Sequence, residues 1–166
     1  MDDIDRIAAQ WRRERPDLDV EPMILIGRLS RIAAIFSAEM GKTFAKYDLN
    51  GATFDVLATL RRAGEPYSLT PNELLANMMI SSGTLTNRID QLVKMGLVER
   101  VKNPKDGRSV VVRITPSGFA RIDRVVTEHV ATQARILARF PAENRVEMNF
   151  LLTELLDGLS QGDETS

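Results

Sequence analysis

The spacing of apolar residues along the chain predicts a mostly helical protein. In several long stretches an apolar side chain recurs every three or four positions, which is the spacing that places one face of a helix against a core. The first stretch, residues 3–14, ends before Pro16, and a long second helix starts at Pro22. A third starts at Gly51 and stops at residues 63–66, where a glycine and a proline interrupt the helical pattern.

Two shorter helices follow, each with a chemical signal at its start. Residues 70–73, Thr-Pro-Asn-Glu, form a capping box with proline at the first helical position, where its missing N–H costs nothing. The next helix is predicted to start at Ser81 or Ser82, whose hydroxyl would cap it, and to end at Gly96. The buried stripe predicted for this helix consists of Leu85, Ile89, Leu92 and Val93.

Beyond this glycine the pattern changes to that of two β-strands. Residues 97–101 and 110–114 are rich in β-branched and apolar side chains, and they flank a polar turn at residues 103–108. This arrangement predicts a β-hairpin. The apolar spacing then becomes helical again and predicts two last helices, over about residues 116–139 and 142–159.

Helix, short turn, helix and hairpin, in this order, form a winged helix-turn-helix, in which the second helix enters the major groove of DNA and the hairpin, or wing, contacts the backbone or minor groove. We therefore predict a mainly α fold with a small β-hairpin wing. Long apolar terminal helices need a partner surface, which predicts a two-fold dimer. The expected parts are N-terminal helices for dimerisation and scaffold (residues 1–50), the DNA-binding region (residues 51–115) and C-terminal dimerisation helices (residues 116–166).

Composition narrows the class of protein. Of the 166 residues 43% are hydrophobic, which is enough for one domain with a core, and no run of about 18 apolar residues could span a membrane. The start, Met-Asp-Asp, lacks the pattern of a signal peptide, so we expect a soluble cytoplasmic protein. There is no cysteine and one histidine, His129, which excludes a disulfide framework, a cysteine nucleophile and a zinc cluster. We interpret His129 as a packed side chain.

Charge is distributed unevenly, although the net charge is only −1. Residues 81–121 hold eight Lys or Arg against three Asp or Glu, a surplus of five positive charges, and the remainder of the chain is acidic. A local basic segment in a chain without net positive charge favours specific contact with nucleic acid over indiscriminate binding of polyanions.

The second helix of the predicted motif has a small, polar face near its N-terminus, opposite the core stripe. Such side chains let a helix approach base edges and phosphates closely. The alternative is an ordinary solvated first turn, but the basic hairpin that follows favours DNA. The residues assigned to DNA contact on this helix are Ser82, Thr84, Thr86 and Asn87.

The hairpin is the second element expected to face DNA. A protruding tip with positive charge can enter a minor groove of negative potential. A charged loop in solvent is the alternative, and the adjoining polar helix face favours DNA contact here too. The basic residues of the hairpin are Arg100, Lys102, Lys105, Arg108 and Arg113.

Several motifs in this region are specific enough to indicate a family. They are Ser-Ser-Gly-Thr-Leu-Thr-Asn-Arg-Ile-Asp-Gln-Leu at residues 81–92, Gly-Leu-Val-Glu-Arg at 96–100, Asp-Gly-Arg at 106–108 and Ile-Thr-Pro-Ser-Gly at 114–118. With them the chain resembles, over nearly its whole length, the MarR (multiple antibiotic resistance regulator) family of dimeric prokaryotic transcription factors. The resemblance implies that Asp106 steadies the wing loop and that Arg108 enters the minor groove. Relatives commonly carry a second arginine at Gly107, so weaker wing contacts are expected.

A narrower resemblance concerns four single residues. Trp11, Asp55, Arg88 and Arg100 match positions associated with the urate-responsive branch of the family. In that branch an anionic purine is thought to bind between the scaffold and the DNA-reading helix and to break a charge contact of the aspartate. The resemblance therefore implies that these four residues bind a ligand.

Helix geometry is compatible with such a site. Arg88 lies about 80° from the middle of the core stripe, so its side chain can reach under the helix towards Asp55, and an anion competing for it would shift the helix. The alternative for Asp55, Arg88 and Arg100 is a structural ion pair with a phosphate contact, and for Trp11 a buried anchor of the first helix. Three further residues are interpreted as core: Tyr47, Met78 and Met79.

The sequence therefore predicts a ligand-responsive transcription regulator, more often a repressor than an activator, that binds double-stranded DNA as a homodimer. No cofactor is predicted; the effector would be a small anion such as urate, a related purine or a phenolic acid. Two other classes remain open. An enzyme is disfavoured because no nucleophile–base pair or metal set emerges. A winged-helix protein-interaction module is the more serious alternative, and a contiguous positive face across both subunits would argue against it.

Overall fold

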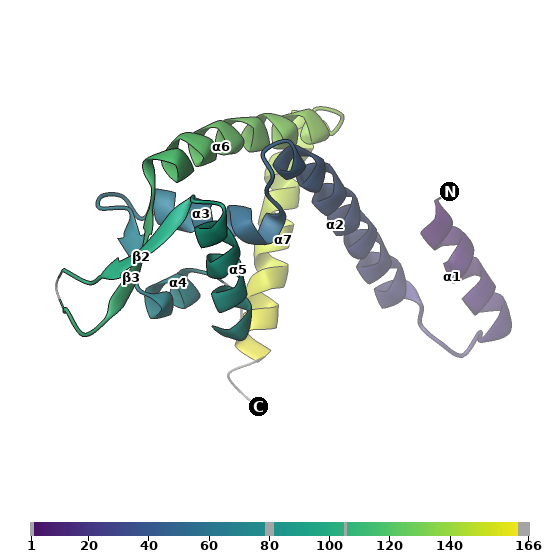
Figure 1. The fold of residues 1–166 in the computed structure, drawn as a ribbon. Coiled ribbons are helices and arrows are strands. Elements are labelled where there is room, and N and C mark those ends of the chain that lie inside the picture. The colour runs from purple at the N-terminus through teal and green to yellow at the C-terminus, as the bar shows by residue number, and fades with distance from the viewer. Residues whose placement is uncertain (1, 79–81, 105, 163–166) are drawn as a thin grey trace. The chain divides into compact units, whose positions relative to one another are not determined.

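The computed structural model describes residues 2–78, 82–104 and 106–162. The chain forms two compact units, Met1–Val130 and Ala131–Ser166. Helices dominate both, and the first also contains a small antiparallel sheet (Figure 1). This confirms the predicted mainly α fold with a small β-wing.

A helical hairpin opens the first unit. Helix α1 (Asp3–Glu14) begins with a capping box in which Asp2 and Asp5 each accept the other's backbone N–H. It packs against α2 (Glu21–Ala45), and Arg28 of α2 donates to Asp2 at 3.0 Å and to Asp5 at 2.5 Å. The two acids that cap α1 thus also bind α2, and Asp3 adds a third ion pair with Arg31 at 3.1 Å.

The winged helix-turn-helix occupies the middle of the first unit. It consists of α3 (Gly51–Arg62), α4 (Pro71–Asn77), α5 (Ser82–Lys94) and the hairpin of β2 (Val98–Lys102) and β3 (Val110–Ile114). The capping box predicted at residues 70–73 is present at the start of α4. A third strand, β1 (Ser68–Leu69), pairs with the other edge of β3. The sequence analysis missed β1 because two residues are too few to show alternation.

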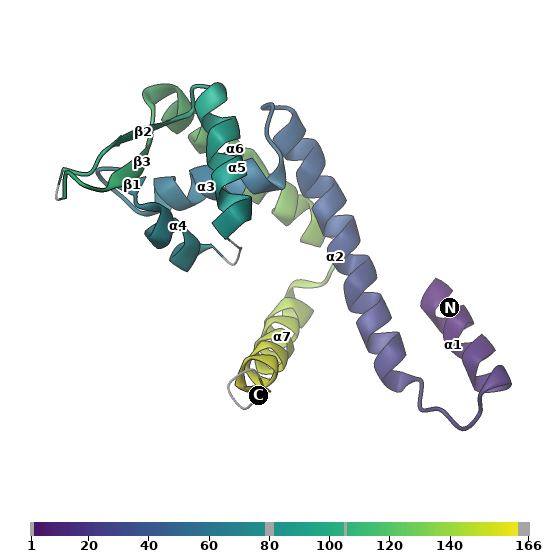
Figure 2. The same ribbon diagram turned by 60° about the horizontal axis from the view of Figure 1, so that its bottom comes forward.

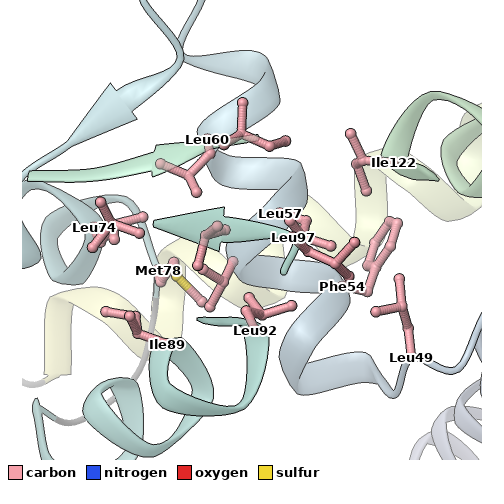
Figure 3. Close-up of a cluster of buried hydrophobic side chains, with 14 of the residues drawn as sticks. Leu49, Phe54, Leu57, Leu60, Leu74, Met78, Ile89, Leu92, Leu97 and Ile122 are labelled. Carbon is pink, nitrogen blue, oxygen red and sulfur yellow. The ribbon is translucent and has the colours of Figure 1, made fainter. Parts of the chain in front are cut away.

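One hydrophobic core joins these elements (Figure 3). On α5 the side chains of Leu85, Ile89 and Leu92 are buried, as predicted. The prediction for Val93 was wrong, since 37% of this residue is exposed. Eight positions after Leu85 the helix has turned about 80° further, so Val93 lies at the edge of the stripe.

Helix α6 (Pro116–Leu137) starts against the base of the hairpin. Thr115 Oγ1 donates to the carbonyl of Gly96 at 2.8 Å and accepts the Gly118 N–H at 3.0 Å. A Cβ on Gly118 would lie 2.9 Å from the carbonyl carbon of Leu97. A residue without a side chain is therefore needed where α6 meets the strand.

The second unit contains the end of α6 and helix α7 (Ala142–Gly162). Arg145 closes the turn between them by donating to the carbonyls of Leu137 at 2.7 Å and Phe140 at 3.0 Å. Among the described residues, no helix is both long and apolar enough to cross a membrane. The large apolar side chains that α7 exposes include Val146, Phe150, Leu151, Leu155, Leu156 and Leu159.

Candidate nucleic-acid interface

The first turns of α5 present a polar face to solvent. Thr84, Thr86 and Asn87 are exposed, whereas Leu85 and Ile89, which alternate with them, are buried in the core. Helix α5 begins at Ser82, but the cap predicted at Ser81 and the side chain of Ser82 lie outside what the structure describes. The described part of this face has the small hydrogen-bonding groups that base edges and phosphates require.

Hydrogen bonds of ordinary length stabilise the described part of the wing tip. The backbone N–H of Asn103 donates to the carbonyl of Ser109 at 2.9 Å, and the N–H of Ser109 donates to the carbonyl of Asp106 at 3.0 Å. The Asp106 carboxylate accepts the N–H of Arg108 at 3.1 Å, which leaves the Arg108 side chain exposed at the tip. Lys105 lies outside the described residues.

Two of the basic residues in the hairpin are neutralised by ion pairs. Arg100 bonds Asp90 of α5 at 2.6 Å, and Arg113 lies 2.8 Å from Glu99 on the neighbouring strand. In the part of the hairpin that the structure describes, Lys102 and Arg108 are exposed and neither forms an ion pair with an acid. The free positive charge of the hairpin is therefore concentrated towards its tip.

The Asp90–Arg100 pair also connects α5 to the wing. Nothing in the sequence pattern connects Asp90 with Arg100. The two residues are ten positions apart, and only the packing of β2 beside α5 brings them together. The pair fixes the helix relative to the hairpin, so that both can meet DNA in one orientation.

The structure brings Asp55 and Arg88 together beneath α5. Arg88 Nη1 lies 3.9 Å from Asp55 Oδ2, and the Arg88 side chain is only 18% exposed. Nε and Nη1 of Arg88 are buried, and within the described ranges neither has a hydrogen-bond partner. Burial raises the pKa of Asp55, and the nearby arginines Arg88 and Arg62 oppose this rise. A buried guanidinium with unused N–H groups can accept an anion.

Trp11 and Arg100, the other two residues of the predicted ligand site, are not at this pair. Trp11 is on α1, which lies apart from α3 and α5 in both views (Figures 1 and 2). Arg100 is engaged by Asp90. The alternative interpretation of Trp11 as a buried anchor was wrong, because 42% of it is exposed. The cause is that the packed face of α1 is centred on the small residue Ala8, which is buried.

A recess of about 650 Å³ lies between α3 and α6. Arg61 crosses it to bond Asp123 at 2.7 Å, and its guanidinium carbon is 4.4 Å from the centre of the Phe119 ring. Sequence reasoning missed this recess because its residues come from helices more than 60 positions apart. We call it the α3–α6 recess; its lining consists of Phe54, Ala58, Arg61, Arg62, Asp123, Val126 and Thr127.

Three other residues that the sequence analysis interpreted as packed do lie against neighbouring side chains. His129 stacks on Phe44 with ring centres 5.4 Å apart, and burial lowers its pKa. The hydroxyl of Tyr47 donates to Glu128 at 2.7 Å, and Met78 is buried in the core. Met79 lies outside the described residues. Within the ranges that the structure describes, no three His, Cys, Asp or Glu side chains are gathered as they would be around a metal ion.

The chain is similar to known proteins in both sequence and structure. Residues 47–109 match the sequence model of the MarR family. The chain is 45% identical over 150 residues to the HTH-type transcriptional regulator PecS of Dickeya dadantii, an alignment that covers 90% of each chain. A mutant of MarR from Escherichia coli complexed with operator DNA has a similar structure, with a TM-score of 0.70 and 28% identity over 82% of this chain and 97% of that one. The wild-type apo form of the same regulator gives a TM-score of 0.65 at 28% identity, over 78% of this chain and 96% of that one.

Proposed function

Since the chain belongs to the MarR family of DNA-binding transcription regulators, we propose that it is a ligand-responsive repressor that binds a pseudo-palindromic operator as a homodimer. One observation carries the DNA-binding part of the proposal. The exposed polar face of α5 stands beside a hairpin whose free charges, Lys102 and Arg108, lie towards its tip. The similar MarR from Escherichia coli, whose structure was determined with operator DNA, supports the same use of this fold.

In this proposal helix α5 and the hairpin of β2 and β3 have different roles. Thr84, Thr86 and Asn87 contact base edges from the major groove, because hydroxyl and amide groups can read donor and acceptor patterns there. Arg108, steadied by Asp106, and Lys102 contribute electrostatic contact with the backbone or minor groove, which carries little sequence information.

Exposed apolar side chains support the proposed homodimer. Helices α2 and α7 both leave large aliphatic and aromatic groups in solvent, and such surfaces in a soluble regulator are normally covered by a partner. We assign the dimer interface to residues 1–50 and 116–166, and DNA binding to residues 51–115. On α2 the exposed apolar residues include Leu25, Ile26, Ile32, Ile35 and Phe36.

The DNA-binding proposal is tested with two variants and a binding titration at several salt concentrations. Arg108→Ala should weaken binding to all sequences and reduce the slope of log affinity against log salt by about one. Asn87→Ala should instead weaken discrimination between operator and unrelated DNA. If both variants lose affinity in the same uniform way, Asn87 does not read bases. If the wild type binds no DNA, the protein-interaction alternative is favoured.

We propose that a small aromatic anion, such as urate or a phenolic acid, weakens operator binding through the Asp55–Arg88 pair. The buried, unused N–H groups of Arg88 support this assignment. Arg62 connects the pair with the α3–α6 recess and its apolar wall, because its charge lowers the pKa of Asp55 and it also lines the recess. An anion held by Arg88 would displace Asp55 and change the position of α5. Trp11 and Arg100 would contribute only after the movement of helix α1 and the release of Arg100 from Asp90.

Calorimetry and DNA binding separate ligand recognition from its effect. Arg88→Ala should bind urate more weakly than the wild type does. Asp55→Asn should bind DNA largely as the wild type does and show a reduced response to urate, because the contact that urate breaks is already absent. Equal urate binding by the wild type and Arg88→Ala would refute the proposed site.

A further inference from the structure

Arg62 occupies a position between the α3–α6 recess and the helix-turn-helix. It is the last residue of α3, and its Nη2 donates to the carbonyl of Asn77 at 2.8 Å. Asn77 is the last residue of α4. The bond therefore links the end of one helix to the point where the chain leaves the other.

The carbonyl that Arg62 holds is one that helix geometry leaves without a partner. The last carbonyls of a helix accept no bond from within it, and a guanidinium satisfies them and interacts favourably with the helix dipole. Beyond Asn77 the chain turns to the extended conformation at Met78, and α5 begins at Ser82. Arg62 thus holds the end of α4, a helix that itself packs against α5.

Arg62 also lines the α3–α6 recess. The other arginine of the recess, Arg61, is neutralised by Asp123. Among the described residues, Arg62 forms no ion pair with an acid, and its bond to Asn77 is open to solvent. An anion that enters the recess therefore meets Arg62 as the available cation.

A carboxylate or enolate competes well with a peptide carbonyl for a guanidinium. The guanidinium is the only charged partner in its bond to a carbonyl, whereas with an anion both partners are charged, and arginine binds carboxylates through two parallel N–H groups. The apolar wall formed by Phe54, Ala58 and Val126 suits the ring of an aromatic anion. Binding of such an anion would draw Arg62 into the recess and away from Asn77.

We propose that Arg62 is a positioning residue that transmits anion binding in the α3–α6 recess to the reading helix, by exchanging the carbonyl of Asn77 for the anion. This inference rests on the proposed ligand response and adds a route for it. Release of Asn77 loosens the end of α4, so that α5 no longer fits the groove in one fixed orientation.

The test measures operator affinity with and without urate, in the wild type and in Arg62→Met. Arg62→Met lacks the bond to Asn77, so without urate it should bind the operator as weakly as the urate-saturated wild type does, and added urate should change its affinity less than about 2-fold. The wild type should lose affinity by a factor within about 5–150, the common range of such coupling.

A second readout separates transmission from a structural role. Amide exchange of Met78, whose N–H donates to Leu75, should accelerate when urate binds the wild type and should be fast in Arg62→Met without urate. If Arg62→Met starts from wild-type operator affinity, or if urate still weakens its binding by the full wild-type factor, Arg62 does not transmit the signal. If urate leaves the wild-type operator affinity unchanged, the proposed ligand response is itself refuted, and the role of Arg62 with it.

Discussion

Replacing Gly118 by alanine tests how tightly α6 is joined to the base of the wing. A Cβ at this position would lie 2.9 Å from the carbonyl carbon of Leu97 and 3.0 Å from Cγ1 of Ile114, with the Leu97 carbonyl oxygen closer still. The backbone of Leu97 cannot move aside freely, because its carbonyl also accepts the N–H of Thr115 at 3.0 Å. The added methyl group must therefore push α6 away from the strand.

The expected cost follows from three contributions. Alanine is favoured over glycine inside a helix by about 1 kcal/mol. Forcing an extra methyl group into a packed site costs about 1–3 kcal/mol, and the hydrogen bonds that Thr115 makes at this junction are worth about 1 kcal/mol each. We therefore expect Gly118→Ala to lower the free energy of unfolding by about 2–4 kcal/mol, since the packing and hydrogen-bond losses exceed the helix preference.

Urea denaturation followed by circular dichroism measures this change, at equal protein concentrations because dimerisation adds to stability. Gly41→Ala is the matched control. Gly41 is also inside a helix, but a Cβ there meets nothing within 4 Å, so the variant should gain about 0.5–1 kcal/mol. If Gly118→Ala is as stable as the wild type, or shifts in the same direction as Gly41→Ala, the close approach of α6 to the strand is not real.

Three further predictions concern local interactions. Thr70→Ala removes the hydroxyl that accepts the Glu73 N–H at 3.2 Å, so thermal unfolding should show a loss of about 0.5–2 kcal/mol. Asp90→Asn breaks a half-exposed ion pair with Arg100, so stability should fall by less than about 1 kcal/mol, while operator affinity falls more than affinity for unrelated DNA; equal losses would contradict an orienting role. Burial raises the pKa of Asp55 above its ordinary value of 3.8, so folding disfavours its ionised form. The protonated form adds stability that is complete below 3.8 and is lost as the pH rises through the folded pKa. Asp55→Asn should accordingly be more stable than the wild type at pH 7 in urea denaturation, and this advantage should vanish at pH 3.

Most of the fold could be predicted because helix boundaries carry local chemical signals. The capping box at Thr70 and the proline at the start of α6 act within a few residues, so the sequence shows them directly. Strand β1 and the exposure of Val93 could not be predicted in this way. Two residues show no periodicity, and at the edge of a helical stripe the spacing alone does not decide whether a side chain is covered.

The candidate site, like the fold, could be predicted only where its features lie within one helix or hairpin. The polar face of α5 and the basic hairpin follow from the sequence because each lies within one element. Pairings across elements do not: Asp90 with Arg100 and Arg62 with Asn77 arise from packing of separate segments. The meeting of Asp55 with Arg88 could be anticipated, because helix geometry and the family resemblance both indicated it.

The hydrogen bonds between Asn103 and Ser109 have a consequence for operator choice. A loop tip that already has its shape loses little conformational freedom on contact with DNA, but it also adapts little to the groove it meets. Minor-groove width depends on base sequence and is smallest in A·T-rich tracts, where the negative potential that attracts arginine is strongest. If the wing enters the minor groove as proposed, base pairs beneath it should therefore be selected through the shape of the duplex that carries them.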